Sequence, residues 1–260
     1  MSRFTPIAIL CLALLCSYCN TPQQEQAPAL QVEVTFDESL EATAVNGRLL
    51  VMFSTDASNE PRFQIMDGPT TQQVFGLDVQ GMKPGEPVRL EGDVQGYPIQ
   101  QLKDLPPGEY KVQALLHRYE TFERADGHTV LLPMDRGEGQ QWNRAPGNLL
   151  NEPLSVSVTD EGGLISIWLN QKIAPITPPE DTEWIKHIKI KSKLLSDFWG
   201  RDMNLGAHEL LTKDFNARPE ARYPLIINHG HFPYDLEGFN PNPPDPDMQP
   251  VYSDRFGVDG

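Results

Sequence analysis

The sequence has very few cysteines, and their positions limit the chemistry of the whole chain. Its 260 residues contain only three, Cys11, Cys16 and Cys19, all within the first 19 positions. The rest of the chain therefore forms no disulfide of its own and offers no thiolate to a metal or a substrate. This excludes cysteine nucleophiles and zinc-finger sites as the basis of its function.

Positive charge is also scarce. Lysine and arginine total 21 against 36 aspartates and glutamates, which gives a formal net charge of −15. Such a surface repels a polyanion except at a local basic patch, and phosphate contacts supply much of the affinity of nucleic-acid binding. We therefore expect no nucleic-acid partner.

The N-terminal apolar run is too short to span a bilayer. Ile7–Leu15 is nine residues long, whereas a membrane helix needs about 20. Preceded by Arg3, it fits the apolar region of an export signal. Cys19 and the polar tether over 20–29 resemble a bacterial lipoprotein signal, with 1–19 as the signal. We expect an exported protein, periplasmic or at the cell surface, bound to the membrane only through a lipid on Cys19. Ordinary secretion and an uncleaved anchor are the alternatives.

Helical periodicity is missing between residues 30 and 173. Apolar and polar residues alternate with the period of a strand, and the 24 prolines of the chain disfavour a helical bundle. We predict a mainly β, antiparallel, immunoglobulin-like sandwich over 30–173. Its strands are expected at Gln31–Phe36, Arg48–Thr55, Glu109–Thr121, Leu154–Thr159 and Leu164–Leu169, the last two as a hairpin.

A proline-rich linker over 174–182 separates the sandwich from a segment over 183–260. This segment is predicted to begin with three strands, at 184–191, 205–211 and 223–230. In the first of them, lysines alternate with apolar residues, so that one face should be basic and the other buried. The lysines form either an anion-binding stripe or a solvated edge that deters aggregation. They are Lys186, Lys189, Lys191 and Lys193.

The third predicted strand of this segment ends in a suggestive pattern. Leu225–Ile227 leads through Asn228 into His229, Gly230 and His231. In α/β-hydrolases, backbone N–H groups after the third strand help to form the oxyanion hole for acyl transfer. Glycine lets the chain bend so that these groups face the substrate oxygen. We therefore take His229, Gly230 and His231 as a candidate oxyanion-hole region.

Longer stretches carry a wider resemblance. Ser192–Arg201, Leu205–Leu211 and Ala221–Phe232 are similar to the start of the hydrolase domain in secreted esterases related to the esterase D group, of the α/β-hydrolase superfamily. Residues 30–173, and Tyr119–Arg144 within them, resemble the β-rich N-terminal module of such proteins. The resemblance implies a serine hydrolase that acts on a small-molecule ester or acyl substrate and needs no cofactor.

The catalytic groups of that family do not appear in the chain. The family places a Gly-x-Ser-x-Gly elbow, then an acid and a histidine, well downstream of the His-Gly strand. After His231 the sequence has one serine, Ser253, without flanking glycines, and no further histidine. We therefore expect 183–260 to be the N-terminal fragment of a hydrolase domain. The chain alone should have no catalytic triad and no activity.

Metal sites are weaker alternatives. His229, His231 and Asp235 could bind a metal with His208, and Asp245 with Asp247 could bind calcium. A solvated acidic loop explains the same residues, and we predict no metal site.

Three further histidines and two tryptophans could be either structural or functional. His117, His128 and His187 are expected to be structural or surface residues. Trp142 and Trp168 either pack in the core or stack on a sugar ring.

Two functions of different classes follow. The first is the N-terminal portion of an exported esterase-like serine hydrolase. The second is a non-enzymatic surface lipoprotein whose sandwich binds a glycan or a protein partner. A downstream reading frame that encodes a nucleophile elbow would decide for the first.

Overall fold

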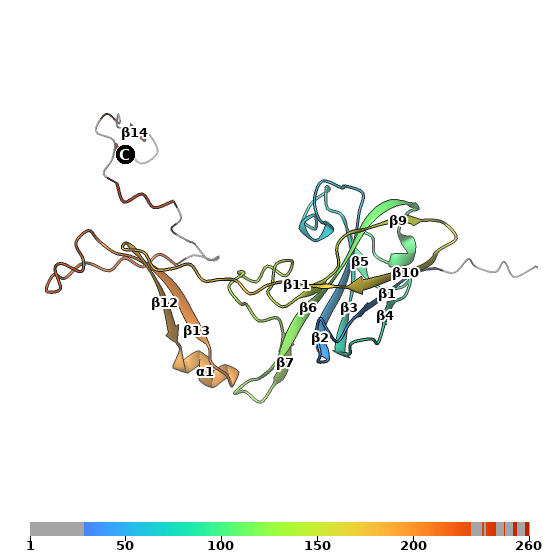
Figure 1. Ribbon diagram of the computed structural model, residues 1–260, viewed down its shortest axis with the longest axis horizontal. Helices are drawn as coiled ribbons and strands as arrows, with labels where there is room; N and C mark the ends of the chain where they lie inside the picture. The colour runs from blue at the N-terminus through green and yellow to red at the C-terminus, as the bar shows by residue number, and fades with distance from the viewer. Residues whose placement is uncertain are drawn as a thin grey trace, which may run out of the picture.

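The protein is mainly β. The computed structural model describes residues 29–229, 236, 238–242, 247, 252–253 and 258–259. Of these residues, 40% lie in strands and 6% in helices, which confirms the β-rich class predicted from the alternating pattern. Most strands belong to two sheets, and a separate hairpin follows them in the chain (Figure 1).

The smaller sheet has three strands in the order β10-β1-β4. β1 pairs with β4 in antiparallel fashion and with β10 in parallel along its whole length. Every second residue of β1 is buried, because successive side chains of a strand point to opposite faces. The strands are β1 Leu30–Phe36, β4 Val88–Leu90 and β10 Gly163–Leu169.

The larger sheet has eight strands and is built around the long strand β6. Its order is β11-β8-β6-β2-β3-β5, and β7 and β9 also pair with β6. β6 begins after Pro106 and Pro107, and the Tyr110 hydroxyl donates to the Pro106 carbonyl oxygen (2.8 Å). The strands are β2 Val45–Ser54, β3 Gln73–Met82, β5 Gly96–Tyr97, β6 Gly108–Glu123, β7 Thr129–Leu132, β8 Leu149–Leu150, β9 Leu154–Val158 and β11 Gln171–Lys172.

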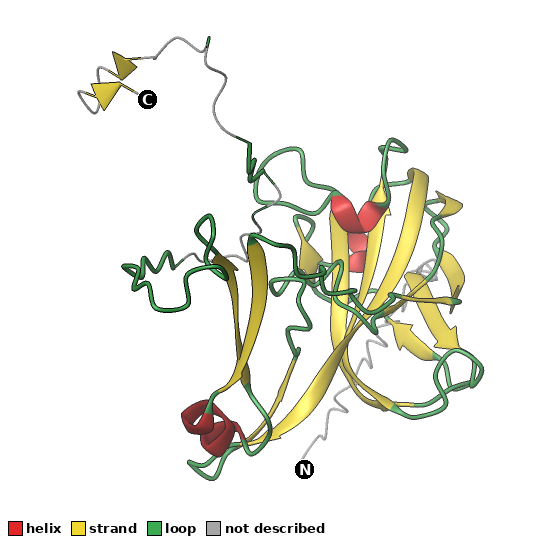
Figure 2. Ribbon diagram, turned by 60° about the vertical axis from the view of Figure 1, so that its left-hand side comes forward, coloured by secondary structure: helices red, strands yellow, loops and turns green. Residues whose placement is uncertain are grey.

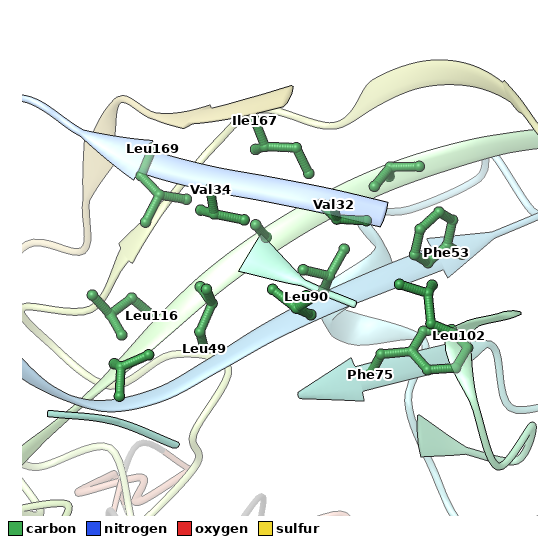
Figure 3. Packing of buried hydrophobic residues seen from close by; sticks show 14 of the residues in the cluster. Val32, Val34, Leu49, Phe53, Phe75, Leu90, Leu102, Leu116, Ile167 and Leu169 are labelled. Carbon is green, nitrogen blue, oxygen red and sulfur yellow. The ribbon is translucent and has the colours of Figure 1, made fainter. Parts of the chain in front are cut away.

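One core lies between the two sheets. Its side chains come from β1, β4 and β10 on one side and from β2, β3, β6 and β9 on the other. Figure 3 shows Val32 and Val34 of the small sheet in the same cluster as Leu49 and Phe53 of the large one. Phe53 meets the rings of Phe75 and Tyr110 edge to face, with centroids 5.9 and 5.8 Å apart. The shared core explains why the two sheets pack together.

The large sheet is covered on its other face as well. Met52, Leu115 and Leu150 form a second buried cluster there, with Trp142 packed against it. Two short 3-10 helices lie in the loops of this module, η1 at Pro61–Phe63 and η2 at Leu102–Asp104. The last four residues of β2 are buried without alternation because this part of the strand has apolar neighbours on both faces. This agrees with the prediction for Arg48–Thr55, whereas the first six residues of β2 alternate.

The predicted hairpin between Leu154–Thr159 and Leu164–Leu169 is wrong. Both strands form, but β9 pairs with β6 in the large sheet and β10 pairs with β1 in the small one. The turn at 160–163 therefore carries the chain from one sheet to the other. In this position Ile167 and Leu169 reach the shared core, which pairing with β9 alone would not provide. The parallel β1–β10 pairing also corrects the expectation of a purely antiparallel sandwich.

A β-hairpin with a short helix in its connection follows the sandwich. β12 Ile185–Lys191 and β13 Asn204–Leu210 are antiparallel, and α1 Lys193–Trp199 lies between them. The Ser192 side chain caps α1 by accepting from the Leu195 N–H. Gly200 ends it with φ +66°, and a Cβ at this position would lie 2.7 Å from the Glu123 carbonyl oxygen. Two of the three strands predicted for this segment thus form.

The helix α1 contacts the far end of β6 (Figure 2). The Ala125 N–H donates to the Phe198 carbonyl oxygen (2.8 Å). The rings of Phe122 and Trp199 meet edge to face at 5.5 Å, and Arg201 forms an ion pair with Glu120. The β6–β7 pair therefore reaches beyond the sandwich and holds the following unit.

The third predicted strand does not form. Residues 221–229 are in neither strand nor helix, and Leu225, Ile226 and Ile227 are 78%, 88% and 79% exposed. A strand needs a neighbour for its backbone N–H and C=O groups, and no strand in the described residues pairs with this stretch. Of the three strands predicted for the start of a hydrolase domain, the structure therefore has the β12–β13 hairpin, followed by an apolar segment that pairs with no described strand. Beyond it, β14 Tyr252–Ser253 pairs with β15 Val258–Asp259.

Candidate functional site

The predicted oxyanion-hole region falls at the limit of the described residues. His229 is exposed and lies outside any strand. Gly230 and His231 lie outside the described residues, as does Cys19. Leu225–Ile227 forms no strand, so the predicted strand that should lead into the oxyanion turn is absent. The oxyanion turn itself includes Gly230 and His231, and its prediction therefore stays a prediction.

The two serines between residues 183 and 229 have structural roles. The Ser196 hydroxyl accepts from the Met203 N–H (2.9 Å) and donates to the Ser192 carbonyl oxygen (2.6 Å). Ser192 caps α1. No hydrogen bond described within residues 29–229 joins a serine hydroxyl to a histidine, the usual base of a serine nucleophile.

The predicted lysine stripe is divided between the two faces of β12 and the first residue of α1, Lys193. Since side chains alternate, Lys186 lies on the face opposite Lys189 and Lys191. Lys191 forms an ion pair with Asp202, and Lys193 forms one with Asp197. No residue of β12 is fully buried, so the expectation of one basic and one buried face is wrong. Exposed pairs of this kind have little energetic weight.

The structure brings together three residues that the sequence interpretation kept apart. His187 of β12 lies directly opposite His208 of β13, and the two rings are 4.8 Å apart at an interplanar angle of 75°. Asp181 Oδ1 accepts from the His187 backbone N–H (2.8 Å) and lies 3.2 Å from His187 Nδ1. This backbone hydrogen bond is the main reason why the pKa of Asp181 is lowered. His187 is thus a partnered residue, not an isolated surface histidine.

A second polar cluster lies where the sandwich meets α1. Glu120 accepts from both Arg136 and Arg201. Burial opposes ionisation of Glu120, but the two guanidinium groups outweigh it and lower the pKa of the carboxyl. Nearby, His117 is buried, and its pKa falls to about 4 because of desolvation and the charge of Arg136. The Glu120 carboxylate thus has two internal cationic partners.

A third cluster borders a hollow on the surface of the sandwich. Glu41 accepts from Arg118 (2.6 Å) and Lys172 (2.8 Å), and the hydrogen bond from Lys172 is the main cause that lowers its pKa to about 2. The adjacent hollow, about 280 Å³ in volume, is open to solvent. Its lining residues are Arg136, Pro146, Gly147, Lys172, Ile173, Pro175 and Ile176. The beginning of the predicted linker therefore packs on the sandwich.

The tryptophans differ in exposure. Trp142 packs against the cluster on the outer face of the large sheet, which confirms the structural interpretation. Trp168 is 46% exposed on the outer face of β10, beside Thr35 of β1. A ring in this position is available to a ligand.

Histidines 117 and 128 fit the expectation of structural or surface residues. His117 is buried, and its ring contacts Tyr119 edge to face. His128 is exposed and lies beside Asp126, with 3.2 Å between His128 Nδ1 and Asp126 Oδ1. The described residues contain no group of three or more His, Cys, Asp or Glu side chains that could hold a metal. Of the residues considered for metal sites, His231, Asp235 and Asp245 lie outside them.

Comparisons with known proteins add no relative. No protein-family model, no curated protein and no solved structure matches the chain. In the described part of the chain, no helix has the length and hydropathy that crossing a membrane requires. The functional argument therefore rests on the residues and their geometry.

Proposed function

We propose that the chain is the N-terminal portion of an exported serine hydrolase that acts on esters or related acyl compounds. The nucleophile, the acid and the histidine of its triad would come from polypeptide beyond residue 260. The observation that carries the proposal is the exposed segment Leu225–Ile227. It follows the antiparallel pair β12–β13, and its three apolar side chains are each at least 78% exposed.

An apolar stretch of this kind is costly to leave in water. Burying each such side chain contributes about 1.5–3 kcal/mol, so a sheet that received Leu225–Ile227 between parallel strands would be stabilised strongly. The resemblance to α/β-hydrolases implies such neighbours and places an oxyanion hole at His229, Gly230 and His231. In this proposal 183–260 begins the hydrolase domain and 30–173 is an immunoglobulin-like sandwich.

The first test compares two proteins with a serine-reactive phosphonate. The 260-residue chain should not be labelled and should not hydrolyse esters in a phosphonate-sensitive way, because the proposal places the nucleophile and its base beyond residue 260. A protein expressed with the downstream reading frame should be labelled once, at the serine of a Gly-x-Ser-x-Gly elbow. Stoichiometric labelling of Ser253, or a downstream frame without such an elbow, would contradict the proposal.

The second test addresses the oxyanion region in the extended protein. Gly230→Val should lower kcat by roughly 100-fold or more, since loss of one oxyanion donor costs about that much. Gly238→Val is the matched control and should leave kcat near the parent value, because a Cβ at Gly238 meets no atom within 4 Å. If both variants retain full activity, His229 and Gly230 do not form an oxyanion turn.

The proposed location depends on Cys19. We propose that the chain is exported and anchored by a lipid on Cys19, which places the sandwich in the periplasm or at the cell surface. Cells grown with a labelled fatty acid should label the protein, and Cys19→Ser should abolish the label. Cys16→Ser is the control. Equal labelling of both variants, or none in the parent, would count against the anchor.

A second candidate function rests on Trp168. The exposed ring on β10 lies beside a polar row on β1 and β4, where Glu33 pairs with Arg89 (2.7 Å). An aromatic platform beside polar groups suits a sugar ring, as expected for a non-enzymatic binding module. Trp168→Ala should abolish retention on an immobilised glycan, whereas Tyr97→Ala, which removes another exposed aromatic ring, should not. Retention that survives Trp168→Ala would exclude this site.

A further inference from the structure

We propose that His187 and His208 form a binding site for a divalent metal ion that prefers imidazole ligands, with Zn²⁺ as its occupant. The two residues lie opposite one another in the β12–β13 pair, and their ring centroids are 4.8 Å apart. Zinc binds imidazole nitrogen at about 2.0–2.1 Å. Rotation of the two side chains about their own bonds would let one ion reach a nitrogen of each ring, and the strand register would stay as it is.

Asp181 orients His187, one of the two ligands. Its Oδ1 lies 3.2 Å from His187 Nδ1 and also accepts from the His187 backbone N–H (2.8 Å). A proton held on Nδ1 by this carboxylate leaves the lone pair of Nε2 for a metal, which is the usual arrangement behind metal-binding histidines. Asp181 is thus a positioning residue and not itself a ligand.

The rings are accessible. The side chain of His187 is 21% exposed, and His208 is exposed on the neighbouring strand. A thiolate is absent from this part of the chain, and imidazole without thiolate suits Zn²⁺, Cu²⁺ and Ni²⁺ better than Mg²⁺ or Ca²⁺. Two protein ligands leave the remaining positions of the ion to water, so this site differs from the closed sites built from four side chains.

Binding of zinc to both histidines would stabilise the pairing of β12 with β13. Neither strand has a fully buried residue, so the hairpin gains little from apolar packing of its own. A ligand that binds the folded hairpin and not the unfolded chain stabilises it by mass action. The metal would therefore order the unit that precedes Leu225–Ile227.

The test is a titration of the full chain with zinc chloride, followed through the imidazole ¹H–¹³C signals. The ring signals of His187 and His208 should shift together with one apparent affinity, and a chelator should reverse both shifts. Because the signals belong to single residues, zinc taken up by the N-terminal cysteines does not imitate this result.

Substitutions separate a shared site from two independent histidines. His208→Gln should abolish the zinc-dependent shift of His187, and His187→Gln should abolish that of His208. Asp181→Asn should weaken binding about tenfold, in line with losses of outer-sphere partners, while an amide oxygen can still accept from the His187 N–H. His128→Gln is the control, because this exposed histidine has a carboxylate neighbour and precedes β7, whose pairing with β6 contains no histidine.

Two results would overturn the proposal. One is a parent protein whose His187 and His208 signals do not move as zinc is added. The other is a His187 shift of unchanged affinity in the His208→Gln variant. If a substitution unfolded the hairpin, the joint shift in the parent protein would still decide the question.

Discussion

Burial changes the acid–base behaviour of His117. The residue lies on the central strand β6, opposite Arg48 of β2. Desolvation, followed by the charge of Arg136, lowers its pKa to about 4. A buried histidine of this kind stays neutral in the folded protein and takes up a proton on unfolding.

The expected consequence is loss of stability as the pH falls. Between pH 6.5 and pH 4 the unfolded state binds more protons than the folded state, so the free energy of unfolding rises with pH in this window. The contribution is on the order of 2 kcal/mol between pH 7 and pH 4.5. Urea unfolding at several pH values should show that His117→Gln has a flatter profile than the parent protein. His128→Gln, which changes an exposed histidine, should keep the parent profile.

Glu41 makes the free energy of unfolding depend on pH in a second, lower pH range. Its pKa is lowered to about 2 chiefly by the hydrogen bond from Lys172, with help from Thr43 and Arg118, while burial acts in the opposite direction. The stability it contributes is fully present above pH 4.5 and is lost as the pH falls toward 2. Glu41→Gln should therefore flatten the profile below pH 4.5 and leave the window of His117 unchanged. A parent-like slope below pH 4.5 in this variant would contradict the assignment.

At the scale of elements, the β6–β7 pair is the link between the sandwich and α1. The ring of Trp199 contacts Phe122 at 5.5 Å and Phe198 at 5.1 Å, and the Arg124 guanidinium lies 5.9 Å from its centroid. An aromatic pair contributes about 0.5–1.5 kcal/mol beyond the apolar area that it buries. A contact of this size should slow local opening between α1 and the β6–β7 pair measurably, but it does not make the sandwich and the following unit unfold as one.

Trp199→Ala should open this link. The Ala125 N–H, which donates to the Phe198 carbonyl oxygen (2.8 Å), should exchange with solvent roughly two- to tenfold faster, as the loss of one aromatic contact implies. Hydrogen exchange at Ala125 measures the effect. Leu194→Ala, on the same helix but 83% exposed, is the control and should leave the rate unchanged. Equal rates in both variants would mean that Trp199 does not hold the link.

At the scale of the whole molecule, the linker over 174–182 packs on the sandwich at its beginning and is exposed in its later part. Pro175 and Ile176 line the hollow beside Lys172, whereas 177–183 is exposed and without strand or helix. The segment over 212–224 is also exposed and without regular structure. Proteases cut such segments first.

Brief digestion with a glutamate-specific protease should give early cuts at Glu180, Glu183 or Glu220. The resistant fragment should contain β1 to β11 and end before Trp184. Glu180→Gln combined with Glu183→Gln should remove the cut in the linker and keep the cut at Glu220. A first cut inside residues 30–172 would contradict the division into a sandwich and a following unit.

Much of the fold follows from the sequence alone. The period-two alternation of Gln31–Phe36 and the apolar run 49–53 within Arg48–Thr55 predict a strand buried on one face and a strand buried on both. β1 has the first pattern, and β2 has the second over its last four residues. The hairpin strands β12 and β13 are also predicted, because alternation and turn residues are local signals. The position of His229 after an apolar run is likewise visible in the sequence.

Only the tertiary structure decides how these strands are joined. The turn at 160–163 is compatible with a hairpin, yet β9 and β10 enter different sheets because the core needs Ile167 and Leu169 on the small sheet. Leu225–Ile227 has the composition of a strand but forms none, since backbone pairing depends on a neighbour that local sequence does not specify. For the same reason the His187–His208 pair was not foreseen: two histidines 21 positions apart become neighbours only through the register of the hairpin.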